Sequence, residues 1–373
     1  MPNSSVRVLV LWADGQSANF GVRVLADGMK TLARMAWGVA VEVDLQDFGA
    51  GDSDVSFGTR SISHDIGRSH GPIKNKLKQY DVILDTGAGD SFADIYGLKR
   101  LFFIAYARFV AARLAIPVVM GPQTIGPFNT NLGRAIAKRI LRSSAVVVAR
   151  DSQSAECAEL LGKKVDSIST DVVFALDVPP SSARRDVIIN ISGLLWSGDR
   201  HVDSAHYRRQ IRELVSSLID RSRNITLLAH VVAPNCVDDD THAINEFLCE
   251  TGLELESIFP TSLEELRAVL AGAELVIGSR MHACLNSLSV GTPAVAWAYS
   301  RKFAPLLNDL GWDYVVDLSA RNSEPALETL VIVDTIDNEK FRRMTADVRQ
   351  RASQRLADSL PALRQLSCIP EAG

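Results

Sequence analysis

The sequence predicts an α/β fold made of two doubly wound domains that face a cleft. Three observations lead to this prediction. The chain has 373 residues, which is too long for one small core. Short apolar runs rich in β-branched residues alternate with segments of helical periodicity, which indicates parallel sheets covered on both faces. The stretch 177–186, DVPPSSARRD, interrupts this alternation and is the best candidate for a linker.

The N-terminal half alternates predicted strands with loops and helices. The strands are expected at Val6–Trp12, 39–46, 81–86, Pro117–Met120 and 145–150, and the helices at 19–36, Lys99–Leu114 and Asn131–Arg142. Ser152 or Ser154 is expected to cap the helix that follows the last of these strands. Because the carboxyl ends of parallel strands share one edge of a sheet, loops at these ends are the first places to look for a ligand site.

The C-terminal half repeats the alternation. Predicted strands at 187–192, 225–232, 273–278 and 293–299 are joined by elements that include the helices Ala205–Arg221 and His282–Val290. A charged amphipathic helix is predicted at Asn338–Leu366. The expected domains are therefore 1–178 and 185–320, followed by a helical tail, 321–373, with packing against the N-terminal domain as one option for it.

Composition and charge narrow the class of protein. A formal net charge of −4 argues against a general nucleic-acid binder, which would show a basic excess. Five cysteines without C-x-x-C spacing indicate buried thiols in a reducing cytoplasm rather than a disulfide framework. The N-terminal segment lacks the features of a signal peptide. The apolar stretch around Arg108 and Arg113 is predicted to be a buried helix and a strand, not a membrane span.

Loops at strand ends in the N-terminal half carry groups suited to a polar ligand. Glycines let backbone N–H groups face an anion or a sugar ring, and the neighbouring polar side chains add hydrogen bonds. An arginine at a strand end either pairs with Asp151 or offers a two-pronged donor to a carboxylate or phosphate. Tight turns and an ordinary salt bridge are the structural alternatives. The candidates are Gly87, Gly89, Asp90, Gln123, Thr124 and Arg150.

The segment 276–303 is the most informative. A buried strand ends at Gly278, and Arg280 and His282 follow at a helix entrance, where free N–H groups favour anions. His282 can transfer a proton near neutral pH, and Lys302 supplies a second cation at the end of the next strand. The alternative is a structural, hydrogen-bonded histidine.

Other charged segments give weaker signals. The other six histidines lie in segments that look polar or linker-like, and the acidic run 238–240 is expected to be a solvated loop. The sequence shows no metal-binding spacing, no P-loop and no catalytic Ser/His/Asp order. Neither a metal nor a cofactor is therefore predicted.

Taken together, these segments resemble the polysaccharide pyruvyl transferase family. The matching motifs lie in order between Gly87 and Leu310: GAGDSFADIYG, GPQTIGPF, ARDSQSAECAELLG, STDVVFAL and GSRMHACLNSLSVGTPAVAWAYSRKF. The last is the most specific, through R-x-H, then G-T-P, then Lys302. GPQTIGP and ARD depart from the usual spellings G-Q-x-I-G-P and V-R-D, and neither change removes a charged group.

The resemblance implies two Rossmann-like domains similar to the B-type glycosyltransferase fold, with phosphoenolpyruvate in the interdomain cleft. It implies transfer of the pyruvyl group to a sugar hydroxyl pair as a ketal, in cell-surface or exopolysaccharide biosynthesis. Arg150, Arg280, His282 and Lys302 would correspond to donor-site residues, with His282 as general acid. The acceptor would be a sugar, glycolipid or polysaccharide. Peripheral association with a membrane is left open, with Arg134–Arg142 as its candidate helix, and the oligomeric state is not indicated.

Two other functions remain open at this point. A sugar-nucleotide glycosyltransferase of the same fold would need an acidic residue for the ribose, a part that Glu264 or Glu265 could play. A non-catalytic sugar-binding relative is the other alternative, and the combination of Arg280, His282 and Lys302 speaks against it.

Overall fold

The chain folds into two α/β units. The structure is a computed structural model that describes residues 6–51, 53–181, 183–320 and 323–366. The first unit comprises Met1–Ser17, Val22–Leu176 and Ala352–Gly373, and the second comprises Ala18–Gly21 and Asp177–Arg351. Each unit is built around one six-stranded sheet, and all the strand pairs in both sheets are parallel.

The first unit has the strand order β2-β1-β3-β4-β5-β6. Its strands are β1 (Arg7–Leu11), β2 (Glu42–Gln46), β3 (Val82–Asp85), β4 (Val118–Gln123), β5 (Val146–Ala149) and β6 (Ser167–Ile168). Its helices are α1 (Phe20–Trp37), α2 (Thr59–Asp65), α3 (Pro72–Leu77), α4 (Leu98–Arg113), α5 (Asn131–Ser143), α6 (Ser152–Leu160) and the last part of α14 (Asn338–Arg364).

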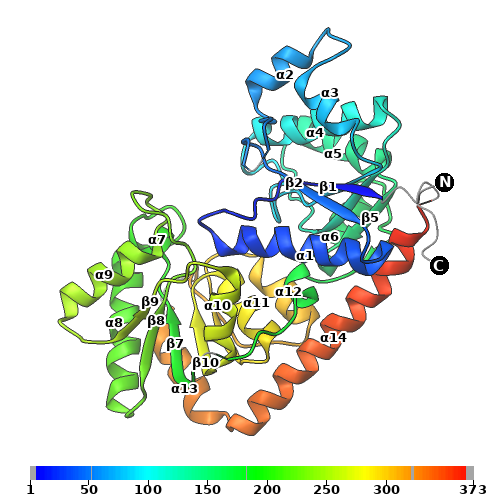
Figure 1. The fold of residues 1–373 in the computed structure, drawn as a ribbon. Helices are drawn as coiled ribbons and strands as arrows, with labels where there is room; N and C mark the ends of the chain where they lie inside the picture. Colours follow the sequence, from blue (N-terminus) through cyan, green and yellow to red (C-terminus); the bar gives the residue numbers. More distant parts are fainter. Residues whose placement is uncertain (1–5, 52, 182, 321–322, 367–373) are drawn as a thin grey trace. The chain divides into compact units, whose positions relative to one another are not determined.

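Successive residues of the strands in this unit contribute to two hydrophobic cores, one on each face of the sheet. Val8 and Val10 of β1 belong to a core that includes α1 and the end of α14. Leu9 and Leu11 point to the other face and belong to a core that includes α4 and α5. This period-two alternation follows from strand geometry and explains the continuous apolar runs. Figure 1 shows α1 beside the end of α14, where Nε1 of Trp37 donates to the carbonyl of Leu363 at 3.2 Å.

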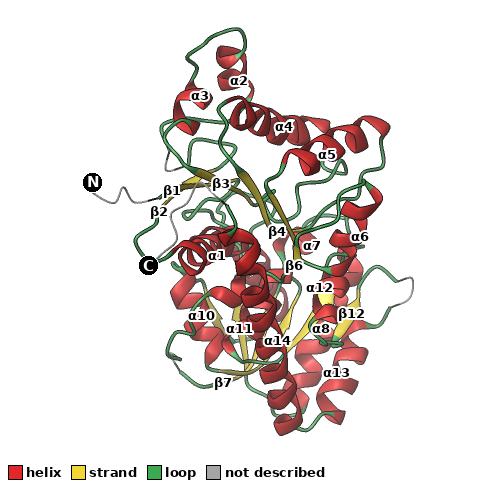
Figure 2. Ribbon diagram, turned by 90° about the vertical axis from the view of Figure 1, so that its right-hand side faces the viewer, coloured by secondary structure: helices red, strands yellow, loops and turns green. Residues whose placement is uncertain are grey.

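The second unit has the strand order β12-β11-β10-β7-β8-β9. Its strands are β7 (Arg185–Asn190), β8 (Ile225–Leu228), β9 (Glu256–Ile258), β10 (Ala273–Gly278), β11 (Ala294–Ala298) and β12 (Val315–Asp317). Its helices are α7 (Gly193–Trp196), α8 (Ser204–Asp220), α9 (Asp240–Thr251), α10 (Leu263–Ala271), α11 (Met281–Val290), α12 (Phe303–Asp309) and α13 (Pro325–Thr335), and α14 begins here (Figure 2). The order is that of a doubly wound nucleotide-binding sheet, so the strand order reverses between β7 and β10.

The prediction of two doubly wound parallel sheets is confirmed, and several local predictions need correction. Asp151, not Ser152 or Ser154, caps α6, because its side chain accepts a hydrogen bond from the backbone N–H of Ser154. Cys284 is buried, but Cys236 and Cys249 are exposed and Cys157 is half-buried, so the expectation of five buried thiols is wrong. Cys368 lies outside the described residues.

The apolar stretch 101–120 forms most of α4 and the start of β4, as predicted. Within the described parts of the chain, no helix is both long and apolar enough to cross a membrane.

Candidate functional site

The candidate site of the second unit lies where the strand order of its sheet reverses. Asn190 ends β7 and Arg280 follows β10, the two strands that flank this point. In open α/β sheets, ligands bind outside the carboxyl ends of the strands at such a point. The hydroxyl of Tyr207 joins the loops that follow the two strands, because it accepts from the backbone N–H of Ser192 at 3.0 Å and donates to Oγ of Ser279 at 2.8 Å.

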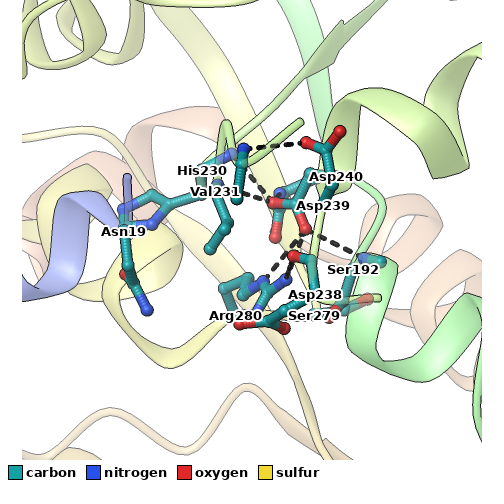
Figure 3. Close-up of polar contacts among 12 residues, drawn as sticks. Asn19, Ser192, His230, Val231, Asp238, Asp239, Asp240, Ser279 and Arg280 are labelled. Atoms are coloured by element: carbon teal, nitrogen blue, oxygen red, sulfur yellow. Dashed lines mark hydrogen bonds and ion pairs between the residues drawn. The ribbon is translucent and has the colours of Figure 1, made fainter. Parts of the chain in front are cut away.

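Asp240 connects the loops that follow three neighbouring strands. It is fully buried at the first position of α9. Oδ1 accepts from the backbone N–H of Gly193 at 2.9 Å and from Nη2 of Arg280 at 2.6 Å. Oδ2 accepts from Nδ2 of Asn190 at 3.0 Å and from the backbone N–H of His230 at 2.9 Å. One carboxylate therefore fixes the ends of β7, β8 and β10 relative to each other (Figure 3).

Arg280 is held by two carboxylates. Its Nη1 lies 2.8 Å from Oδ1 of Asp238, and its Nη2 also donates to the carbonyl of Asp238 at 2.7 Å. Burial lowers the pKa of Arg280, but Asp240 and Asp238 raise it by more, so the guanidinium stays charged. These two acidic side chains neutralise the charge of Arg280. Their contacts with the guanidinium also fix the loop 238–240 against the start of α11.

His282 lies in the first turn of α11, at the same edge. The helix has no side-chain cap, so its N-terminus keeps the partial positive charge that attracts anions. The ring packs closely on Gly21, where a methyl group would lie 2.8 Å from Nδ1 of His282. The carbonyl of His282 accepts from Nδ2 of Asn286 at 2.9 Å. Backbone and ring are thus both held.

A second histidine, His230, lies within electrostatic range of His282 and is almost completely buried. Its Nε2 is 3.2 Å from Nδ2 of Asn286, the amide that also contacts the carbonyl of His282. Burial, followed by the charges of His282 and Arg280, lowers the pKa of His230 well below its usual value. His230 is therefore neutral near pH 7.

Lys302 lies after β11, within electrostatic range of His201. Burial is the main reason why the pKa of His201 is lowered, and the charges of Arg200 and Lys302 lower it further, while Asp238 raises it. The ring of His201 also packs edge-on against Tyr299, with centroids 5.2 Å apart. Lys302 and Asp238 of the acidic loop therefore both act electrostatically on the ring of His201.

The first unit brings its predicted residues together at the ends of β3, β4 and β5. Gly87 and Gly89 have φ values of +51° and +79°, which favour glycine. The carbonyl of Gly89 accepts from the backbone N–H of Thr124 at 2.9 Å. Oε1 of Gln123 occupies the space that a side chain at Gly87 would need. These loops pack tightly and present Thr124 and Asp90 at the strand ends.

Arg150 and Asp90 are each engaged by neighbours in that unit. Arg150 is buried, its Nη1 lies 3.2 Å from Oδ2 of Asp171, and its Nη2 donates to Oγ1 of Thr124. Asp151, the partner considered from the sequence, is more distant, with 3.9 Å between Nε and Oδ2. Asp90 accepts from the hydroxyl of Tyr96 at 2.7 Å. The predicted residues of the two units therefore form two groups, and their functional roles stay predictions.

Sequence reasoning missed the residues that hold the second group in place. The sequence predicts a solvated loop at 238–240, but Asp239 and Asp240 are buried and Asp238 is half-buried. The sequence predicts a polar or linker-like segment around His230, but His230 follows the buried strand β8 and is itself buried. The place of these residues in the sequence is the signal that could have identified them. His230 lies near the end of a predicted strand, and an acidic run before a helix can supply the helix cap, as Asp239 does for α9.

Two further sequence expectations concern ligands. Oε2 of Glu265 accepts from the backbone N–H of Thr261 at 2.8 Å, which makes it part of the cap of α10. Among the residues that the structure describes, no group of three or more His, Cys, Asp or Glu side chains could hold a metal ion. The expectation that the protein needs no metal remains a prediction.

Comparison with known proteins shows the fold and the family. The UDP-GlcNAc 2-epimerase from Neisseria meningitidis bound to UDP-GlcNAc has a TM-score of 0.55 at 12% identity, covering 95% of this chain and 100% of that one. Anabaena HepE in complex with UDP and glucose has a TM-score of 0.51 at 13% identity, covering 96% and 97%. These likenesses agree with the predicted pair of Rossmann-like domains and show the fold alone.

Sequence comparison goes further. The amylovoran biosynthesis protein AmsJ of Erwinia amylovora is 26% identical over 259 residues, which are 64% of this chain and 61% of that relative. The match thus spans less than two thirds of the relative. The sequence model of the polysaccharide pyruvyl transferases matches residues 41–301, well over half of the chain. The chain belongs to the polysaccharide pyruvyl transferase family.

Proposed function

We propose that the protein is an enzyme that moves the pyruvyl group of phosphoenolpyruvate to two hydroxyls of a sugar, glycolipid or polysaccharide, as a cyclic ketal. The observation that carries the proposal is the position of His282. It lies in the first turn of an uncapped helix, at the point where the sheet of the second unit reverses its strand order. Family membership supports the same reaction class.

The charges at this edge suit a donor with a carboxylate and a phosphate. Because Asp238 and Asp240 neutralise Arg280, the positive charge for the donor comes from Lys302, the start of α11 and a protonated His282. In the proposed site Arg280 positions α11 and the loop 238–240. It does not need to contact the donor itself.

The chemistry follows from the enol phosphate group of phosphoenolpyruvate. A protonated His282 delivers its proton to the methylene carbon, which becomes a methyl group, and the central carbon becomes electrophilic. One sugar hydroxyl attacks that carbon and loses its proton to the imidazole. Phosphate then leaves, and the second hydroxyl attacks the same carbon and loses its proton to solvent or phosphate. The products are the ketal and inorganic phosphate, and His282 ends in its starting protonation state.

The group in the first unit is proposed to bind the sugar acceptor. Gly87 and Gly89 shape the loop, and Asp90, Gln123 and Thr124 supply hydrogen-bonding groups at the strand ends. Arg150 donates to Thr124 and pairs with Asp171, so its proposed role there is to position Thr124. We also propose a cytoplasmic location. The exposed thiols of Cys236 and Cys249 support it, because a reducing compartment keeps thiols free.

Reaction in heavy water tests this proposal. The full chain would be incubated with phosphoenolpyruvate and methyl hexosides that carry two free neighbouring hydroxyls. NMR is expected to show a ketal methyl group with one deuterium, together with released phosphate. The change His282→Gln should slow this by about 10²–10⁴-fold, whereas His242→Gln, at an exposed position on α9, should not. A full rate in folded His282→Gln, or turnover of UDP-glucose instead of phosphoenolpyruvate, would contradict the proposal.

A further inference from the structure

The segment between the two aspartates Asp94 and Asp151 has an unusual charge pattern. From Ile95 to Arg150 the sequence contains nine lysines and arginines and no aspartate or glutamate, although 44 of its 373 residues are acidic and its net charge is −4. Such a one-sided distribution within an acidic chain indicates a surface for an anionic partner. The helices α4 and α5 make up most of this segment.

Both helices turn a mixed apolar and basic face to solvent. On α4, Phe102 is 49% exposed and Phe109, two turns later, is 52% exposed. On α5, Leu132 is 57% exposed, and Ile136 and Arg139 follow it at the spacing of one helix face. Large aromatic side chains that are half open to water on one helix face are not needed for the core, which α4 builds from its opposite side.

A groove runs between these two helices, which lie side by side in both views (Figures 1 and 2). Its volume is about 740 Å³. Phe102, Tyr106 and Phe109 line it from α4, and Ile136, Lys138 and Arg139 are among the residues that line it from α5. Arg108 also lines the groove, but it is buried and pairs with Asp85 at 2.7 Å, so it adds no net charge.

The basic side chains around the groove are accessible to an anionic partner. Lys138, Arg139 and Arg142 are exposed. Within the described ranges of the chain, none of them forms an ion pair with an acidic side chain. The face that combines Phe102, Phe109, Leu132 and these three basic residues, together with the groove, is called the α4–α5 face below.

We propose that the α4–α5 face docks the protein on an anionic lipid bilayer. The aromatic and aliphatic side chains would enter the boundary between headgroups and acyl chains, and the basic groups would contact lipid phosphates. A bilayer matches both parts of the face. A nucleic acid would leave the aliphatic side chain of Leu132 in water, and an acidic protein segment would need a matching apolar ridge. The proposal is independent of the pyruvyl transfer reaction.

Vesicle binding of the full chain tests this proposal without any substrate. The probes are vesicles of phosphatidylcholine alone and of phosphatidylcholine mixed with phosphatidylglycerol, in low and raised salt. Each basic residue near an anionic surface contributes roughly a five-fold gain in binding. The triple change Lys138→Gln, Arg139→Gln and Arg142→Gln should therefore weaken binding to the mixed vesicles by roughly 100-fold. The double change Phe102→Ala and Phe109→Ala should weaken it by about ten-fold or more.

A matched control removes three exposed charges elsewhere. Lys340, Arg342 and Arg343 lie on the first turns of α14, which also carry acidic residues. Changing these three to Gln should leave vesicle binding within about two-fold of the parent. Unchanged melting temperatures would show that all variants are folded, since every changed side chain is exposed.

Any of three results would overturn the proposal. The protein could bind mixed vesicles no better than phosphatidylcholine alone, the α14 control could lose as much binding as the triple variant, or the triple variant could bind fully. Analytical ultracentrifugation tests whether a second copy of the chain occupies this face instead. If the chain is a dimer in solution and the Phe102→Ala, Phe109→Ala variant is a monomer, the α4–α5 face belongs to a second copy and not to a bilayer.

Discussion

Asp240 and Arg280, 40 residues apart in the sequence, form a buried ion pair in which Oδ1 of Asp240 accepts from both Nε and Nη2 of the guanidinium, at 3.1 and 2.6 Å. The other carboxylate oxygen accepts from Asn190, His230 and Val231. The pair therefore sets the distance between the loop after β8 and the start of α11. Since His282 is two residues beyond Arg280, the position of the proposed general acid depends on it.

Removal of the Asp240 charge should destabilise the protein strongly. In Asp240→Asn the side chain keeps its size, but it presents two N–H donors to neighbours that are themselves donors and leaves Arg280 with only Asp238. Breaking one side of a buried ion pair costs about 3–5 kcal/mol. Urea unfolding of the full chain measures this. In Asp238→Asn, where the side chain is 35% exposed, the loss should be much smaller. Equal losses in both variants would contradict the role given to Asp240.

Two glycines of α1 should respond differently to the same substitution. A methyl group at Gly21 meets Nδ1 of His282 at 2.8 Å, whereas one at Gly28 meets the carbonyl oxygen of Val172 at 2.7 Å. We therefore predict that Gly21→Ala lowers turnover by about 100-fold, through a displaced imidazole, with little change in melting temperature. Gly28→Ala should lose about 1–3 kcal/mol of stability through overpacking. Parallel melting curves and rate measurements check both, and normal turnover in Gly21→Ala would argue against the placement of His282.

The buried His230 should give the protein a pH-dependent stability. In the unfolded chain it titrates near pH 6.5. Burial first, and then the charges of His282 and Arg280, lower its pKa in the folded protein. Below about pH 6.5 the unfolded chain therefore binds more protons, and the free energy of unfolding falls by up to about 1.4 kcal/mol per pH unit until the pH reaches the lowered pKa.

The substitution His230→Gln should remove this slope, while His242→Gln, at an exposed position, should keep it. Urea unfolding of the parent and both variants between pH 5 and 7 measures the difference. A parent and a His230→Gln variant with parallel pH profiles would show that His230 is not buried in its neutral form.

Lys302 should contribute mainly to donor binding. A hydrogen bond to a charged group gives about 1.5–3 kcal/mol, so Lys302→Met should raise KM for phosphoenolpyruvate roughly ten- to hundred-fold with a smaller effect on kcat. The neighbouring Arg301 is exposed, and Arg301→Met serves as the matched control. Steady-state kinetics of phosphate release separates the two constants, and similar effects in both variants would show only a general electrostatic influence.

The two parallel doubly wound sheets could be predicted from the sequence, and so could the strand ends at which the candidate residues lie. Apolar runs such as Val8–Leu11 are buried on both faces, so they show clearly in a single sequence. The sequence also predicts the ends of α4 and α11 to within one residue. Here the signal is glycine, which precedes α4 and follows α11.

The contacts of the site could not be predicted in the same way. An acidic run is usually solvated, and only the tertiary fold brings Arg280 to Asp238 and Asp240. No sequence pattern indicates that these carboxylates neutralise Arg280, or that Arg150 pairs with Asp171 rather than with Asp151. Such pairings depend on loops that meet at a sheet edge, and the separation along the chain does not reveal them.

Thermal stabilisation by phosphoenolpyruvate tests the central claim most directly. At 100 times its Kd a ligand adds about 2.7 kcal/mol to the folded state, so the parent protein should melt several degrees higher with phosphoenolpyruvate, and UDP-glucose at the same concentration should have no effect. The double variant His282→Gln, Lys302→Met should lose the response. A response to UDP-glucose alone, or an undiminished response of the double variant to phosphoenolpyruvate, would contradict the assignment of the donor to the start of α11.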